Sequence, residues 1–325
     1  MPSAYLPPVS VAIGTRNGAT FIAEQLSSIV GQSYPPTEIV LSDDASTDDT
    51  VAIAEHVVGA SGVALQVIRN PTPLGVTANF QQALEACTGE LVALSDQDDR
   101  WHPDRLARVV PLFAARPLLL LVHCDATLVD SAGAPLGASL FDAIELGAGD
   151  RRRIQGGAAL DLLLRRNVVT GATVVMRASL VAQARPFPDA WVHDEWLAMM
   201  AAVFGEIDLV DEQLVDYRQH DGNQIGARRL GLRDKVGRVQ EPRAVRNARL
   251  EARAVALAER LHGSTASATV QLLADEKLAH ERVRNALPAR RLARVTPVVR
   301  QLSRGRYARF GRGLVDAVRD LLQPA

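Results

Sequence analysis

Three aspartates occur within four positions, at Asp96, Asp98 and Asp99, directly after the apolar residues 91–94. An unbroken apolar run of this kind is typical of a strand buried on both faces of a sheet. In open α/β sheets, such strands end at the crevice that binds ligands. Asp96 and Asp98 share one side of an extended segment, and a divalent cation that also holds phosphate oxygens would offset their repulsion. The alternative interpretation is a solvated acidic turn before a helix near Pro103.

The segments around this acidic stretch alternate between strand and helix patterns. We predict strands at 9–13, 38–42, 64–68 and 91–94. Between them we predict helices at 21–29, from an N-cap region at 46–49 through 58, and at 77–87. Gly31 is suited to end the first helix. This β-α-β-α-β-α-β order predicts a mixed, mostly parallel Rossmann-like sheet with flanking helices.

The chain up to residue 225 continues with less regular patterns. We expect a helix at 103–113, a strand at 118–123, a loop or flap at 131–153, a strand at 168–176 that contains Gly171, a short helix opening at 191–196 and a strand at 207–210. Segment 216–223 is dense in side chains that can bind ligands, and its alternative interpretation is an ordinary polar loop.

Charge divides the chain near residue 226. Residues 1–225 carry a net charge of −14, whereas residues 226–325 carry +13 and are rich in Ala and Arg at helical spacing. We therefore predict a catalytic domain at 1–225 and a basic helical region at 226–325. The two cysteines indicate no disulfide framework and fit a reducing compartment. We expect no signal peptide, and the run 118–122 is too short to span a bilayer.

Five short motifs carry a family resemblance when taken in their order along residues 9–225. They are Val9-Ser10-Val11 with Thr15 and Asn17, Asp43-Asp44-Ala45-Ser46-Thr47-Asp48, Asp96-Gln97-Asp98-Asp99-Arg100-Trp101, His193-Asp194-Glu195-Trp196, and Tyr217-Arg218-Gln219-His220. Together they resemble the family 2 inverting glycosyltransferases of the GT-A fold, and within them the bacterial rhamnosyltransferase-like branch.

The resemblance implies a donor-binding half of the site. Gly14, Thr15, Arg16 and Asp44 would line the nucleobase pocket, with a carboxylate accepting from a base N–H. Two departures from the family pattern affect base recognition. Arg16 stands where many members have Tyr, and Ala45 replaces a common Gly.

The resemblance also implies metal, phosphate and catalytic residues. Asp98 would be the main ligand of Mg²⁺ or Mn²⁺ and His220 the second, while Asp96 would contact the ribose or the metal. Arg218 would contact the diphosphate, and Asp194 matches the general base.

The chemistry of sugar transfer fits these residue types. A leaving nucleoside diphosphate gathers negative charge that a divalent cation stabilises, and the attacking hydroxyl must lose its proton to a base. Asp194 and Glu195 point about 100° apart on a helix, so only one of them can be that base. The family match favours Asp194, and Glu195 is interpreted as an acid that complements the helix dipole. Structural roles are expected for Trp101, Trp196, Asn79 and His193, although either tryptophan is also placed to line an acceptor cleft.

Two other functions are compatible with an acidic nucleotide site. A sugar-phosphate nucleotidylyltransferase would carry a Gly-rich loop with Arg and Lys after the first strand, which residues 14–18 do not supply. A non-catalytic module that binds nucleotide-sugar or glycan would be expected to lose Asp194, Asp98 or His220. A nicotinamide-dependent dehydrogenase would need G-x-G-x-x-G after a strand, and the sequence has none.

The sequence therefore predicts a metal-dependent inverting glycosyltransferase of surface polysaccharide biosynthesis, such as that of O-antigen. The leading donor is dTDP-rhamnose, and the expected acceptor is a glycan or lipid-linked oligosaccharide. We expect a cytoplasmic protein without a nucleic-acid partner. Eight arginines and no acid lie in 290–312, followed by an apolar stripe at Leu314, Val315, Val318, Leu321 and Leu322. Two hypotheses stand for this tail: peripheral contact with the inner membrane surface, or packing on the acidic catalytic domain.

Overall fold

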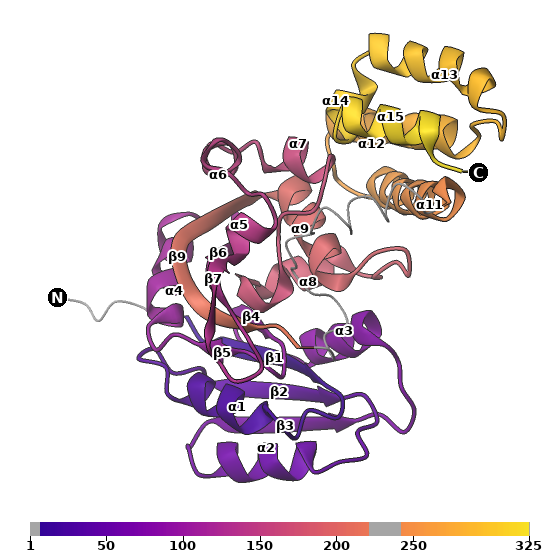
Figure 1. Ribbon diagram of the computed structural model, residues 1–325. Coiled ribbons are helices and arrows are strands. Elements are labelled where there is room, and N and C mark those ends of the chain that lie inside the picture. The colour runs from indigo at the N-terminus through magenta and orange to yellow at the C-terminus, as the bar shows by residue number, and fades with distance from the viewer. Residues whose placement is uncertain (1–6, 221–241, 325) are drawn as a thin grey trace. The chain divides into compact units, whose positions relative to one another are not determined.

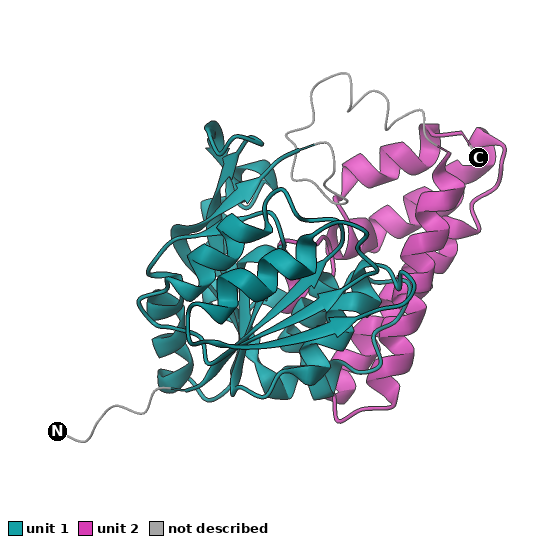
Figure 2. Cartoon of the chain, turned by 90° about the horizontal axis from the view of Figure 1, so that it is seen from below, with its two compact units in different colours: residues 1–159, 169–227 teal, residues 160–168, 228–325 magenta. Residues whose placement is uncertain are grey.

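The computed structural model describes residues 7–220 and 242–324. The chain divides into two compact units, residues 1–159 with 169–227 (unit 1) and residues 160–168 with 228–325 (unit 2) (Figure 2). The boundary predicted near residue 226 lies outside the described residues and stays a prediction. No helix in the described part of the chain is long and apolar enough to cross a membrane.

Unit 1 is built on a nine-stranded mixed sheet with the order β3-β2-β1-β4-β8-β6-β9-β5, and β7 pairs with β6 (Figure 1). The strands are β1 Val9–Thr15, β2 Glu38–Asp43, β3 Ala64–Arg69, β4 Leu91–Ser95, β5 Arg100–Trp101, β6 Leu119–Val129, β7 Pro135–Ser139, β8 Val174–Arg177 and β9 Glu206–Arg218. Strands β3, β2, β1 and β4 pair in parallel. Their carboxyl ends therefore meet at one edge of the sheet.

Helices cover both faces of this parallel part. The first four are α1 Ile22–Val30, α2 Thr50–Gly59, α3 Val76–Ala86 and α4 Arg105–Ala115. Val11 and Ile13 on β1 join one apolar cluster with α1, α2 and α4. Gly14 lies on the opposite face of β1 and packs against Phe80 of α3. The predicted mixed sheet with flanking helices, and the C-terminal helices, are confirmed.

The second half of the sheet brings its last strand back to the acidic segment. β8 is antiparallel to both β4 and β6, whereas β9 runs parallel to β6 along its whole length. The short strand β5 follows the acidic segment and pairs with the end of β9, placing Arg100 opposite Asp216 and Trp101 opposite Val215. This pairing carries residues 216–220 next to residues 96–99.

Three predictions for this half were wrong. Residues 131–153 are not a loop: they contain β7, α5 Leu140–Ala143 and most of α6 Ala148–Gln155. The side chain of Ser139 caps α5, while Asp150 in the first turn of α6 and arginines in its last turn complement the helix dipole. Gly171 lies in a 3-10 turn before β8 rather than inside a strand. The strand predicted at 207–210 extends to Arg218, because pairing with β6 resumes at Gln213 after a register shift that skips residues 211–212.

Unit 1 also contains α8 Ala178–Ala184 and α9 His193–Phe204, while α7 Ala159–Leu163 begins at the edge of unit 1 and continues in unit 2. Unit 2 is helical, with α11 Arg243–His262, α12 Ala268–Asn285, α13 Arg291–Ser303, α14 Arg306–Phe310 and α15 Leu314–Leu322. Helices α11 and α12 pack against each other, as do α13 and α15. A small apolar cluster of Leu287, Val298, Tyr307 and Ala317 joins the last helices.

Candidate active site

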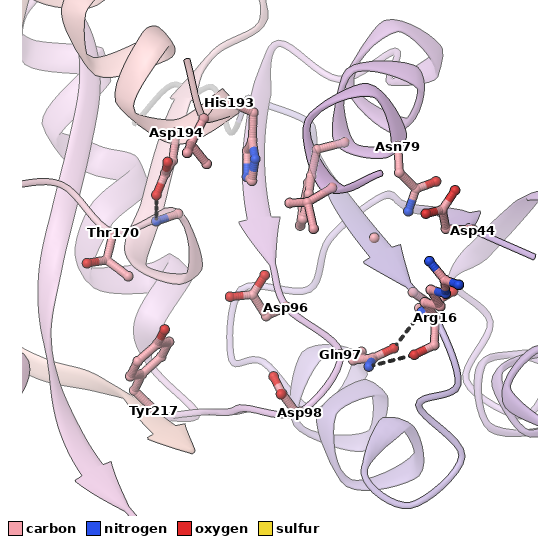
Figure 3. Close-up of a pocket in the computed structure, with 16 residues that line it drawn as sticks. Arg16, Asp44, Asn79, Asp96, Gln97, Asp98, Thr170, His193, Asp194 and Tyr217 are labelled. Atoms are coloured by element: carbon pink, nitrogen blue, oxygen red, sulfur yellow. Dashed lines mark hydrogen bonds between the residues drawn. The ribbon is translucent and has the colours of Figure 1, made fainter. Parts of the chain in front are cut away.

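A cavity of about 200 Å³ opens at the carboxyl ends of β1, β2 and β4 (Figure 3). In Figure 3, Asp194 and His193 lie on one side of it, Asp44 and Arg16 on the other, and Asp96 between them. Seven residues predicted from the sequence line this cavity together, namely Gly14, Thr15, Arg16, Asp44, Asp96, Asp98 and Asp194. These seven residues are up to 180 positions apart in the sequence.

The acidic residues at the end of β4 are held in an unfavourable electrostatic environment. Burial, followed by the charges of Asp98 and Asp194, raises the pKa of Asp96 to about 7. Burial likewise raises the pKa of Asp99 well above its ordinary value, with Asp98 and Asp96 adding to the effect. The buried guanidinium of Arg105 opposes both shifts. A cluster with this excess of negative charge is suited to bind a cation.

The two predicted metal ligands lie side by side. The ring Nε2 of His220 is 2.8 Å from Oδ2 of Asp98, and the ring also packs against that of Phe21, with 5.0 Å between centroids. Among the described residues, no group of three or more His, Cys, Asp and Glu side chains is placed to hold a metal ion. Mg²⁺ and Mn²⁺ suit a site with few protein ligands when substrate phosphates complete the coordination. The pair fits such an ion.

Arg218 holds the acidic segment to the end of β9. Its backbone N–H donates to Oδ1 of Asp99 at 2.9 Å, and its Nε donates to the backbone oxygen of Asp98 at 2.7 Å. Its two remaining guanidinium nitrogens donate to the backbone oxygen of Ser131 and to the carboxylate of Glu24. The side chain is buried and does not line the cavity. These contacts give Arg218 a positioning role, and its contact with a diphosphate stays a prediction.

Asp194 lies in the first turn of α9, and its carboxylate is held by backbone donors. Oδ2 accepts from the N–H of Gly171 at 2.8 Å, and Oδ1 accepts from the N–H of Glu195 at 2.7 Å. A Cβ on Gly171 would lie 3.3–3.4 Å from atoms of Asp194 and His193, so the glycine permits this close approach. Asp194 lines the cavity, whereas Glu195 does not. The arrangement fixes one carboxylate of the pair toward the cavity.

Asp44 borders the opposite side of the cavity, at the end of β2. Its carboxylate is buried and accepts from the backbone N–H groups of Leu74 and Gly75, the latter at 3.1 Å. A carboxylate has about four acceptor positions, so Asp44 keeps capacity for a further donor such as a base N–H. The loop that follows Asp44 tightens at Ala45, whose φ of +61° is in the left-handed region. This conformation explains why glycine is common there in the family that the motifs resemble.

Gln97 was not predicted as a site residue, although it stands inside the acidic motif. Its Oε1 accepts from the N–H of Arg16 at 2.8 Å, and its Nε2 donates to the carbonyl of Arg16 at 3.1 Å (Figure 3). Through this pair of hydrogen bonds, the Gln97 side chain joins the loop after β4 to the backbone of the loop after β1, much as a neighbouring strand would. Side chains alternate along an extended segment, so Gln97 is expected to point to the side opposite Asp96 and Asp98. This alternation was the sequence signal for a separate role of Gln97.

Aromatic residues complete the wall. His193 stacks on Phe80 with 4.1 Å between ring centroids, and burial lowers its pKa to about 3, so the imidazole is neutral at physiological pH. Burial, followed by the charges of the four surrounding carboxylates, raises the pKa of Tyr217 well above its ordinary value, so its hydroxyl stays protonated. Phe80 and Tyr217 were not predicted to line the site. Nothing in the local pattern marks Phe80, whereas Tyr217 stands in the fifth motif, which was the available signal.

The residues given structural interpretations pack as expected. Trp101 is buried beneath the guanidinium of Arg105, 3.9 Å from its ring centroid. Trp196 is fully buried, and its Nε1 donates to the carbonyl of Ala184 at 2.6 Å. Asn79 accepts from Ser42 at 2.7 Å and donates back to its carbonyl at 2.9 Å. Neither tryptophan lines the cavity.

Residues 10–139 match the family model described as glycosyl transferase family 2. This segment is a family 2 glycosyltransferase domain. The match includes Asp44, Asp96 and Asp98, whereas Asp194 and His220 lie beyond it. The place of these last two residues in the site therefore rests on the structure and on the motif order.

Several curated bacterial proteins are similar to this chain. EpsE of Bacillus subtilis (strain 168) is 38% identical over 104 residues, which are 32% of this chain and 37% of EpsE. The dTDP-rhamnosyl transferase RfbG of Shigella flexneri is 26% identical over 245 residues, which are 68% of this chain and 78% of RfbG. The chain spans between about a third and three fifths of the length of the first curated relatives that it matches.

Solved structures confirm the GT-A fold. TarS residues 1–349 of S. aureus, in complex with UDP-GlcNAc, match with a TM-score of 0.60 and 19% identity, covering 96% of this chain and 89% of that one. The mannosyltransferase PcManGT of Pyrobaculum calidifontis, in complex with GDP-Man and Mn²⁺, matches with a TM-score of 0.57 and 21% identity, covering 94% and 76%.

Proposed function

We propose that this chain is a metal-dependent inverting glycosyltransferase. It moves a sugar from a nucleotide-sugar to a hydroxyl of a glycan or lipid-linked acceptor in surface polysaccharide biosynthesis. The observation that carries the proposal is the single cavity that joins Asp44, Asp96 and Asp98 with Asp194. The family 2 domain at residues 10–139 supports the same reaction class.

The donor would occupy the side of the cavity formed by the loops after β1, β2 and β4. Gly14, Thr15, Arg16 and Asp44 would surround the nucleobase, and Asp96 would meet the ribose or the cation. The cation would be held by Asp98 and His220, whose side chains already lie within 2.8 Å of each other. A bound Mg²⁺ or Mn²⁺ supplies positive charge that offsets the negative charge of the leaving diphosphate.

Asp194 would take the proton from the attacking hydroxyl. The backbone N–H groups of Gly171 and Glu195 hold its carboxylate in one orientation across the cavity from Asp44. The neighbouring His193 is neutral because burial lowers its pKa to about 3, so it does not compete as a charged acid. Attack from the face opposite the leaving group inverts the anomeric centre.

We favour dTDP-rhamnose as the donor and O-antigen-like polysaccharide as the product. The support is the similarity to RfbG, a dTDP-rhamnosyl transferase by name, over 68% of this chain. Proteins that share the fold are bound to UDP-GlcNAc or GDP-Man in their structures, so the fold itself accommodates several nucleotides. Arg16, beside the expected base pocket, is a candidate for setting this choice.

A donor panel tests the proposal. Purified protein is incubated with dTDP-rhamnose and with UDP- and GDP-sugars, with Mn²⁺, Mg²⁺ or a chelator, and nucleoside diphosphate release is measured. Release of nucleoside diphosphate that needs metal supports glycosyl transfer. Pyrophosphate formation from a sugar phosphate and a nucleoside triphosphate would indicate a nucleotidylyltransferase, and donor binding without turnover would indicate a binding module.

A matched pair of variants tests the cation site. Asp98→Asn removes the carboxylate charge with little change in shape, and Asp49→Asn makes the same change at an exposed position of unit 1. We expect Asp98→Asn to lose activity while remaining folded, and Asp49→Asn to retain activity. Near-normal turnover of Asp98→Asn in chelator-treated buffer would overturn the metal assignment.

A further inference from the structure

We propose that the outer faces of α13 and α15 form a docking surface for an anionic lipid bilayer. We call this surface the docking face, and define it by seven aliphatic residues, namely Leu292, Val295, Val299, Leu314, Val315, Val318 and Leu322. Each of these side chains is between 46% and 89% exposed. The proposal deepens the proposed function, because a lipid-linked acceptor would lie at such a bilayer. The biological purpose of the docking face rests on that function, whereas bilayer binding itself does not.

The docking-face residues form one stripe on each helix. On α13 they occur at positions i, i+3 and i+7, and on α15 at positions i, i+1, i+4 and i+8. These spacings place each set on one side of its helix. The opposite sides pack inward, where Val298 of α13 and Ala317 of α15 join the apolar cluster of unit 2. Each helix therefore has a second apolar side that this cluster does not use.

The inner sides of these helices hold buried charges as well as apolar residues. Arg294 on α13 is buried, and its guanidinium donates to the carbonyls of Pro288, Ala289 and Gln323. Asp320 on α15 is fully buried as well. Soluble helices ordinarily place charges outside and leucines inside. Exposed leucines and valines on the outer side, opposite these buried charges, indicate that the outer side meets an apolar phase.

The charge around the docking face selects the partner. Arg290, Arg291, Arg300 and Arg304 are exposed, and none makes an ion pair with another described residue. On α13, Arg291 and Arg300 flank the stripe at about 75° and 105° to either side of its centre. An apolar stripe bordered by arginines is the pattern of helices that lie in the interface of an anionic membrane. A second protein copy would bring the same positive charge against itself.

Vesicle co-sedimentation of the full chain tests the docking face. The vesicles contain either equal parts of phosphatidylglycerol and phosphatidylcholine or phosphatidylcholine alone. The face variant combines Leu292→Ser and Val299→Ser with Leu314→Ser and Val318→Ser. Its control combines Val245→Ser and Leu272→Ser, which are exposed aliphatic positions on α11 and α12. We expect the face variant to bind anionic vesicles at least about tenfold more weakly and the control to bind like the parent.

Charge variants separate the electrostatic contribution to vesicle binding from the contribution of the apolar residues. Arg291→Gln, Arg300→Gln and Arg304→Gln should each weaken binding to anionic vesicles by about fivefold, and high salt should have the same direction of effect. Binding to phosphatidylcholine alone should change little. Substitution is preferable to deletion of the last helices, because deletion would remove Asp320 from the buried Arg284, 2.7 Å away.

Two results would overturn the proposal. One is equal binding of the face variant and its control to anionic vesicles while both remain folded by circular dichroism. The other is a dimer in vesicle-free sedimentation that the face substitutions dissociate, with no vesicle binding by the parent. Nucleoside diphosphate release in vesicle-free buffer is measured on the same samples, so that a failed docking face and a failed enzymatic assignment give different outcomes.

Discussion

The cavity of unit 1 and the interior of unit 2 both hold buried carboxylates, but their partners differ. Around the cavity, burial and the charges of neighbouring carboxylates raise the pKa of Asp96 and Asp99, and the buried Arg105 offsets only part of the effect. In unit 2, Asp320 contacts Arg284 and Arg246 and accepts from the Tyr307 hydroxyl at 2.9 Å.

A second buried carboxylate in unit 2 also has cationic partners within the protein. Glu281 contacts Lys277 at 3.1 Å and Arg284 at 2.9 Å, and all three side chains are buried. A buried charge that is paired within the protein has a structural role, and removing one partner is costly. A buried charge left partly unpaired indicates that its partner is a ligand. This contrast distinguishes the carboxylates of a ligand-binding site from those that stabilise the fold.

The largest expected effect is on the catalytic side. Asp194→Asn should lower turnover by roughly 10²–10⁴-fold, because a positioned general base contributes that much. Donor affinity, measured by calorimetry, should change little because Asp194 lies across the cavity from Asp44. Glu195→Gln is the control and should retain most activity. If Glu195→Gln is the inactive variant instead, the base is assigned one position too early.

The corresponding change in unit 2 should affect stability. Asp320→Asn leaves the buried Arg284 and Arg246 without their carboxylate, so the free energy of unfolding should fall by about 3–5 kcal/mol. Asp275→Asn breaks an exposed contact with His262 and should cost less than about 1 kcal/mol. Urea titration measures both. A loss for Asp320→Asn as small as that of its control would remove the distinction drawn above.

A buried histidine gives unit 1 a dependence of stability on pH. His123 lies in β6, burial lowers its pKa to about 4, and neither ring nitrogen has a hydrogen-bond partner among the described residues. Between this value and the unfolded pKa of about 6.5, the unfolded chain binds the extra proton, so stability falls as pH falls. Lowering the pH from 6.5 to 5 should cost about 1.5 kcal/mol through this residue.

Removal of the imidazole tests that contribution. Unfolding free energies of the parent and His123→Leu are compared between pH 7 and pH 5, with His56→Gln, an exposed position on α2, as control. The His123→Leu profile should be flatter than that of the parent, and the control profile should match the parent. Parallel profiles for the parent and His123→Leu would contradict the burial effect.

The smallest expected effect concerns the loop beside Asp44. Ala45 has a φ of +61°, which costs a residue with a Cβ roughly 1–2 kcal/mol. Ala45→Gly removes that strain but adds unfolded-state entropy, so we expect a net gain of up to about 1 kcal/mol. Thermal denaturation measures it, with Ala52→Gly in α2 as a destabilising control. A loss of stability for both variants would show that the left-handed turn costs nothing.

The first half of the fold could be read from sequence because its signals are local. Strands β1, β2 and β4 are apolar runs bounded by turn residues, and parallel pairing puts their ends together. Strand β9 could not be read to its end, because Glu212 and Gln213 interrupt the apolar pattern. Its length is set by pairing with β6, a contact between segments more than 80 residues apart.

The same division applies to the site. Asp44, Asp96 and Asp98 were predictable because they directly follow strands whose ends must meet. Gln97 bridges to Arg16 across 81 positions, and Phe80 gains its role only by stacking on His193. The partners of Arg218 likewise lie in three separate segments. Such roles depend on which segments become neighbours, and no local pattern encodes that choice.

The pair of Asp98 and His220 makes the site a late product of folding. The two residues are 122 positions apart, and strand β9 must lie along β6 before His220 can reach Asp98. Closing a loop of this length has an entropic cost that is repaid only once the whole sheet is paired. During synthesis, a chain that has reached β8 already contains every acid at the end of β4 but lacks one of the two side chains proposed to hold the cation. Metal-binding competence would then be acquired together with the last strand, so that an unfinished sheet exposes no complete catalytic centre.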